Sequence, residues 1–228
     1  MSAQHMPGAA SGEVRRLVVL RHGRTAWNAE GRAQGHSDVS LDRSGHAEAA
    51  AAAPWIARLS PVALWSSDLA RARETAAYVA KESGLDPVFD ARLREFALGE
   101  RTGLTNAEFE ARFPQQYAAF REGRWDPLPG METTEELAAR VSAALVDLVA
   151  SIAPGETAAV VAHGGAIKVG VSALLGWTPE IAQALRHPVN CGWALLEHEG
   201  PVSAGRWRLA AWNLSVPDPD FTSAPPVR

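Results

Sequence analysis

The chain has 228 residues, of which 46% are apolar and 21% are charged, values typical of one globular domain with a full hydrophobic core. Its net charge of −4 provides no overall basic field, which argues against nucleic acid as a partner. Cys191 is the only cysteine. No internal disulfide can therefore form, and we expect a reducing, cytoplasmic environment.

No membrane or export segment is expected. No apolar run approaches the ~20 residues that a bilayer-spanning helix needs, and the N-terminal residues lack the apolar core of a signal peptide. We expect residues 1–14 to be a disordered extension, residues 15–215 a single domain, and residues 216–228 a Pro-rich disordered tail.

Short apolar runs alternate with helix-like segments along the chain. Continuous runs of this length are typical of strands buried on both faces of a parallel sheet. In chain order, the expected elements are a strand at 17–20, a helix at 44–59, a strand at 62–65, a helix at 69–83, a short strand at 87–89, helices at 105–120 and 133–154, a strand at 157–162, a helix at 166–175, and strands at 192–197 and 206–212. The alternation predicts an α/β fold, a three-layer α/β/α sandwich with a mostly parallel central sheet.

Capping residues suggest where the first two long helices begin. Asp42 or Ser44 can cap the first of them, and Pro54 is expected to bend or shorten it. Ser67 or Asp68 can cap the second.

Reactive side chains follow four of the expected strands: Arg21 and His22, then Arg71, then Glu95, and finally His163. Ligands of open α/β sheets bind beyond the carboxyl ends of the strands. A parallel sheet would therefore bring these residues to one crevice.

Together these residue types suit phosphoryl transfer. A neutral His22 can attack phosphorus near pH 7 and form a phosphohistidine. Arg21 and Arg71 offer forks of N–H donors matched to phosphate oxygens, and His163, when protonated, adds a further donor. Glu95 can protonate the leaving oxygen and then activate the attacking water. The histidines lack metal-ligand spacing, so we expect neither a metal nor a cofactor.

Four segments carry these residues: LVVLRHGRTAWN at 17–28, SSDLARARET at 66–75, LRE at 93–95 and VVAHGG at 160–165. In this order they resemble the motifs of the histidine phosphatase superfamily, whose fold is phosphoglycerate-mutase-like. The resemblance covers residues 15–214. It implies that Arg71, rather than Arg73, binds phosphate, that Glu95 is the proton donor, and that Asn28 contacts the phosphate or the substrate.

Two positions depart from the usual pattern of this family. Arg24 stands where Glu or Gln is usual, so it alters the charge at the mouth of the site and is a candidate substrate-binding residue. Met131 replaces a common Gly, which leaves the path of its loop open. Gly164 is a further candidate, because a glycine lets a backbone N–H group approach phosphate closely.

The segment at 98–105 resembles the phosphatase branch rather than the cofactor-dependent mutases, and the segment at 206–213 is similar to that of actinobacterial phosphatases acting on glucosyl-3-phosphoglycerate. We therefore predict a phosphomonoesterase that acts on a small phosphorylated metabolite, a sugar phosphate or a glycerate phosphate. Two alternatives remain: a phosphoglycerate mutase, and a non-catalytic module that binds phospho-ligands. We expect no nucleic-acid or membrane partner, and a homodimer is one option for the assembly.

Overall fold

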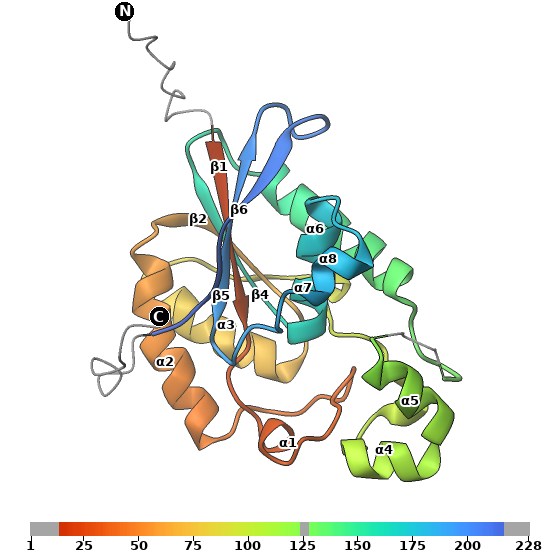
Figure 1. The fold of residues 1–228 in the computed structure, drawn as a ribbon. Coiled ribbons are helices and arrows are strands. Elements are labelled where there is room, and N and C mark those ends of the chain that lie inside the picture. The colour runs from red at the N-terminus through yellow and green to blue at the C-terminus, as the bar shows by residue number, and fades with distance from the viewer. Residues whose placement is uncertain (1–13, 124–127, 217–228) are drawn as a thin grey trace, which may run out of the picture.

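The computed structural model describes residues 14–123 and 128–216 (Figure 1). The extension expected at 1–14 and the tail expected at 216–228 lie outside these ranges, except for Val14 and Val216. Val14 already belongs to the first strand. Within the described part of the chain, no helix has the length and apolar character needed to cross a membrane.

Six strands form one central sheet in the order β3-β2-β4-β1-β5-β6. They are β1 (Val14–Arg21), β2 (Pro61–Ser66), β3 (Val88–Phe89), β4 (Thr157–Ala162), β5 (Trp193–Glu199) and β6 (Arg206–Leu214). Strands β1 to β4 pair in parallel, whereas β5 runs antiparallel to β1 and β6 antiparallel to β5. The predicted mostly parallel sheet is confirmed, with an antiparallel edge.

Helices cover both faces of this sheet (Figure 1). One face carries α2 (Arg43–Ala57) and α3 (Ala70–Ser83), and the other carries α6 (Thr134–Ala150) and α7 (Gly164–Leu174). The shorter helices are α1 (Ala26–Ala29), α4 (Asn106–Arg112), α5 (Pro114–Arg121) and α8 (Pro179–Gln183). The predicted three-layer α/β/α sandwich is therefore confirmed.

The apolar run in β1 is continuous because both of its faces are buried. Leu17 and Val19 pack against α6 and α7, while Val18 and Leu20 pack against α2 and α3. Successive side chains of a strand point to opposite faces, so this single strand contributes to both halves of the core.

Two expectations about α2 have different outcomes. Asp42 is its N-cap, because its carboxylate accepts a hydrogen bond from the Gly45 N–H at 2.8 Å. The expected shortening at Pro54 is wrong, since the helix continues to Ala57. Only the N–H group that proline lacks is lost from the helical ladder.

The expected cap of α3 is also wrong. Asp38, from a distant loop, accepts the hydrogen bond from the Ala70 N–H at 2.5 Å. Ser67 instead bonds to His163, and Asp68 forms a bidentate pair with Arg94. Both candidates are therefore engaged by residues that no local pattern indicates.

The single helix expected over 105–120 is in fact two helices. Helix α4 ends before Phe113, and Pro114 begins α5. A residue that precedes proline is disfavoured in the helical region, whereas proline suits the first turn of a new helix. The break turns α5 back against α4, and the two form a small lobe beside the carboxyl edge of the sheet (Figure 1).

Candidate active site

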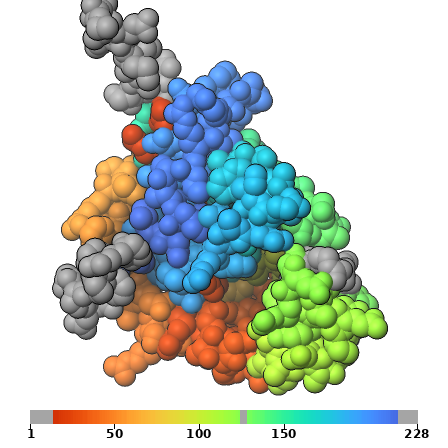
Figure 2. Space-filling model, in the orientation of Figure 1, coloured from red at the N-terminus to blue at the C-terminus, as the bar shows by residue number. Residues whose placement is uncertain are grey.

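A cavity of about 430 Å³ opens at the carboxyl ends of β1 and β4. The sequence-predicted residues on its wall are Arg21, His22, Asn28, Arg71, Glu95 and Gly164. Its outer wall comes from three parts of the chain, the β1–α2 connection, the α4–α5 lobe and the region around α8. The surfaces of these parts adjoin one another in Figure 2. The parallel topology thus brings the four motifs together, as expected.

His22 follows β1 and is almost fully buried, with 3% of its surface exposed. Its Nδ1 lies 2.7 Å from the carbonyl oxygen of Gly23. A carbonyl oxygen can only accept, so Nδ1 carries the proton and Nε2 keeps its lone pair. His22 is therefore held in the tautomer whose Nε2 is the nucleophilic atom.

The carbonyl of Gly23 is itself held in place from both sides. The Gly23 N–H donates to the Thr75 hydroxyl at 3.0 Å, and that hydroxyl donates to the Arg71 carbonyl at 2.7 Å. A side chain on Gly23 would come within 2.5 Å of the Gly45 carbonyl oxygen in α2. Only glycine fits here, and helices α2 and α3 together fix the loop that orients His22.

Arg71 lies in the first turn of α3 and is fully buried. Its Nη1 and Nη2 donate to the carbonyls of Ser37 and Gly35, each at 2.8 Å, and its Nε donates to Nδ1 of His163 at 3.2 Å. Burial lowers the pKa of Arg71 to about 10, so it stays charged at neutral pH. Guanidinium has five N–H donors, and two remain for a ligand.

His163 is the N-cap residue of α7 and lies behind His22, with 5.1 Å between the ring centroids. Its Nδ1 accepts from Arg71, so Nε2 carries the proton and donates to the Ser67 hydroxyl at 2.8 Å. Burial, reinforced by the charge of Arg71, holds the pKa values of both His163 and His22 well below the usual range. Both rings are therefore neutral at pH 7.

Arg21 and Asn28 present free donors to the cavity. Nη1 of Arg21 donates to the Pro188 carbonyl at 2.7 Å, while its Nε is buried and has no partner among the described residues. The Oδ1 of Asn28 accepts from the Thr25 N–H at 3.1 Å, which leaves its NH₂ group for a ligand. A buried donor without a partner is costly, and an anion bound here would satisfy it.

Glu95 holds the start of α7. Its Oε1 accepts from the N–H groups of Phe96 and Ala166, each at 3.0 Å, and its Oε2 accepts from Gly165 at 2.9 Å. A carboxylate has about four lone-pair sites, and the open one is on Oε2. A side chain on Gly165 would come within 2.5 Å of Oε1, so this glycine permits the contact.

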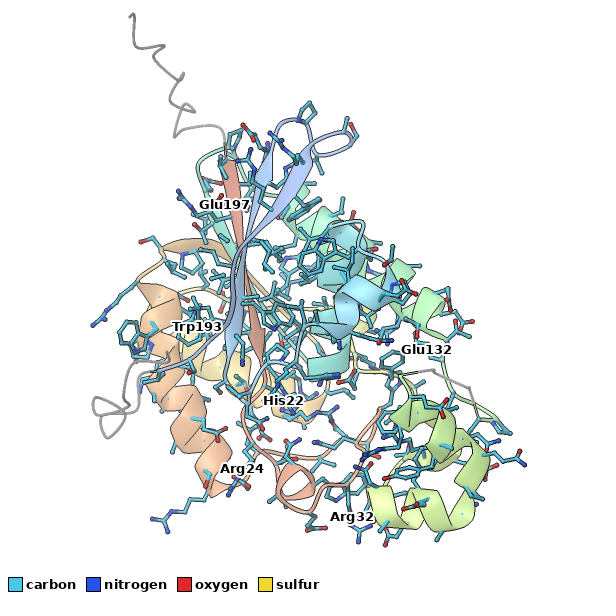
Figure 3. The ribbon with its side chains drawn as sticks, viewed as in Figure 1. His22, Arg24, Arg32, Glu132, Trp193 and Glu197 are labelled. Atoms are coloured by element: carbon cyan, nitrogen blue, oxygen red, sulfur yellow. The ribbon has the colours of Figure 1, made fainter. Side chains whose placement is uncertain are left out.

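Two residues singled out by the sequence lie elsewhere. Arg24 points away from His22 toward the start of α2 (Figure 3), where it bonds to Asp42 and Ser44, each at 2.8 Å. It does not line the cavity, so its expected contact with substrate finds no support in this geometry. Met131 forms an isolated antiparallel bridge with Leu98, which defines the path of its loop.

Sequence reasoning missed several residues that surround the site. Ser67 and Thr75 orient His163 and Gly23 through the bonds described above. Gln34 lines the cavity with a buried Oε1 that has no partner among the described residues. Lys168 and His187 also lie on the wall. No local pattern marks these residues, because the hydrogen bonds of Ser67 and Thr75 and the cavity itself join segments that are distant in the sequence.

Within residues 14–123 and 128–216, no group of three or more His, Cys, Asp or Glu side chains is placed to hold a metal ion. The charged groups at the inner end of the cavity are Arg21, Arg71 and Glu95. Two guanidinium groups and one carboxylate leave this end positive, which suits a phosphate group.

Comparisons with known proteins agree on one family. The model of the histidine phosphatase superfamily (branch 1) matches residues 17–215. A glucosyl-3-phosphoglycerate phosphatase of Mycobacterium tuberculosis is 39% identical over 214 residues, which cover 89% of this chain and 96% of that protein. Phosphoglycerate mutase-like protein 4 of Arabidopsis thaliana is 39% identical over 156 residues, covering 67% of each. The structure of mycobacterial glucosyl-3-phosphoglycerate phosphatase with VO3 matches with a TM-score of 0.82 at 38% identity, over 88% of this chain and 100% of that chain.

The two buried neutral histidines predict how stability depends on pH. The folded-state pKa values of His22 and His163 lie below the ordinary value of 6.5, so the unfolded chain takes up protons first as the pH falls. The contribution of these two rings to the free energy of unfolding should therefore be complete above pH 6.5 and decrease toward pH 5. The expected slope is about 1.4 kcal/mol per pH unit for each histidine.

Urea unfolding between pH 5 and pH 8 measures this slope. Replacing either buried histidine by Gln should flatten it, whereas His46→Gln, at an exposed position, should leave it unchanged. An unaltered slope in both buried variants would show that neither ring is held neutral.

Proposed function

The chain belongs to branch 1 of the histidine phosphatase superfamily and is a phosphoric monoester hydrolase; from this premise we propose that it works through a phosphohistidine on His22. The observation that carries the proposal is the hydrogen bond from Nδ1 of His22 to the Gly23 carbonyl. It directs the lone pair of Nε2 away from the loop, in a ring already neutral at pH 7. Such an imidazole needs no separate base to become a nucleophile.

In the first proposed step, Nε2 of His22 forms a bond to phosphorus as the ester P–O bond breaks in line. Arg21 and Arg71 hold the phosphoryl oxygens through both steps with the donors that they do not already use. Their positive charge offsets the charge on those oxygens. His163 acts through Arg71: its Nδ1 accepts from that guanidinium and its Nε2 donates to Ser67, so neither ring nitrogen is left to donate to phosphate.

In the proposed mechanism, Glu95 is the general acid of the first step and the general base of the second. The open site on its Oε2 carries the proton that the leaving alkoxide takes when the ester bond breaks. In the second step a water molecule attacks phosphorus, the N–P bond breaks, and the proton from the water returns to Glu95. General acid–base catalysis by one carboxyl group closes the cycle.

We propose that the substrate is a small phosphorylated sugar or glycerate, in particular glucosyl-3-phosphoglycerate. The support is the name shared by the M. tuberculosis relative and the mycobacterial structure with VO3. A phosphatase fits better than the alternative of a phosphoglycerate mutase, because the M. tuberculosis phosphatase is 39% identical over 89% of this chain, whereas a probable phosphoglycerate mutase of Salmonella is 33% identical over 88% of it. The intact set of charged residues also disfavours a non-catalytic binding module. A coupled mutase assay with and without bisphosphoglycerate separates the two activities.

Hydrolysis of a panel of phosphorylated metabolites and of p-nitrophenyl phosphate tests the proposal as a whole. We expect phosphate release, and we expect His22→Asn to reduce kcat by at least about 10³-fold. Circular dichroism and thermal unfolding provide the check that the variant folds. His46→Asn, which changes an exposed histidine, should keep full activity. Normal turnover by His22→Asn would contradict the mechanism.

Glu95→Gln separates proton donation from the capping of α7. The variant loses the acid and weakens the cap, so activity and stability should both fall. Loss of the acid alone predicts a kcat decrease of about 10²-fold or more on glycerol 3-phosphate, whose alkoxide needs a proton. The decrease in kcat should be much smaller on p-nitrophenyl phosphate, because its p-nitrophenolate leaves without being protonated. Equal decreases in kcat on the two esters would mean that Glu95 has only a structural role.

A further inference from the structure

Lys168 is one of only two lysines in the chain, the other being Lys81. It stands in α7 four residues after Gly164, and both residues line the cavity. Residues four apart share a helix face and are separated by about 6 Å along the axis. Lys168 therefore lies on the same wall as the phosphate end, one helical turn further from it.

The ammonium group of Lys168 has no carboxylate partner among the described residues. It is partly buried, and burial lowers its pKa. By contrast, Arg32, another cation that lines the cavity, forms ion pairs with Glu30 and Glu108 at 2.9 and 2.8 Å. A partly buried cation without a counter-charge is unfavourable, so the cavity favours an anionic group beside Lys168.

The wall is continuous from the phosphate end to Lys168. Arg21 Nε lies 3.4 Å from the position that a side-chain carbon on Gly164 would take, and His187 Nδ1 lies 3.6 Å from the same point. The positive charge of Lys168 contributes to lowering the pKa of His187, together with burial, the largest cause. One side of the cavity thus carries, in order from the phosphate end, Arg21, His187 and Lys168.

We propose that Lys168 is a specificity-determining residue that binds a carboxylate of the substrate while Arg21 and Arg71 hold its phosphate. The proposal rests on the proposed function, since it concerns the same cavity. A three-carbon acid phosphorylated at one end carries its two anionic groups about as far apart as one helical turn. The enzyme should therefore prefer phosphate esters that carry a carboxylate over neutral esters of the same length.

Kinetics with two matched esters test this preference. 3-Phosphoglycerate carries a carboxylate, and glycerol 3-phosphate has the same carbon skeleton without one. For Lys168→Met we expect kcat/KM to fall about tenfold or more on 3-phosphoglycerate, mainly through KM, and to change less than about twofold on glycerol 3-phosphate. Lys168→Arg should restore most of the loss, and Lys81→Met, at an exposed site on α3, should behave like the parent. Equal effects on both esters, or none, would overturn the proposal.

A binding measurement separates failure of this inference from failure of the proposed function. With only two lysines, acetylation of each can be followed by mass spectrometry. In the His22→Asn variant, 3-phosphoglycerate should protect Lys168 but not Lys81, and glycerol 3-phosphate should protect neither. Hydrolysis of both esters by the parent enzyme without this protection would refute the role of Lys168 alone. Protection of Lys168 without hydrolysis of either ester would support the contact between Lys168 and the carboxylate and refute the phosphatase mechanism.

Discussion

The site depends on one hydrogen bond, from Nδ1 of His22 to the carbonyl of Gly23. This contact between adjacent residues fixes which ring nitrogen is protonated and where the other points. It is effective because Gly23 cannot move: α3 binds its N–H through Thr75, and α2 packs against its Cα. Both helices on one face of the sheet therefore contribute to the position of a single lone pair.

The same atoms serve the fold and the proposed chemistry. Glu95 holds the start of α7 through three N–H groups, and Arg71 binds two carbonyls of the loop that covers it. Each keeps unused hydrogen-bonding capacity directed to the cavity. A site built in this way is rigid before substrate binds, which reduces the cost of ordering it at the moment of reaction.

The sequence was sufficient to predict the sheet and the convergence of the candidate site residues at one cavity. The apolar runs are continuous because β1 and β4 are buried on both faces, and parallel topology then determines where the residues that follow these strands lie. The interactions that could not be predicted join distant segments. Asp38 caps α3 in place of Ser67, which is engaged by His163. Such partners depend on the tertiary fold rather than on local propensity.

The most direct test of this account is the position of phosphorus in the covalent intermediate. Enzyme mixed with p-nitrophenyl phosphate, quenched rapidly in alkali and digested, can be examined by mass spectrometry and phosphorus NMR, which distinguishes the two phosphohistidine isomers. The hydrogen bond to Gly23 predicts phosphate on Nε2 of His22 and on no other residue. Phosphate on Nδ1, on a different residue, or no phosphoenzyme at all under turnover would contradict the account.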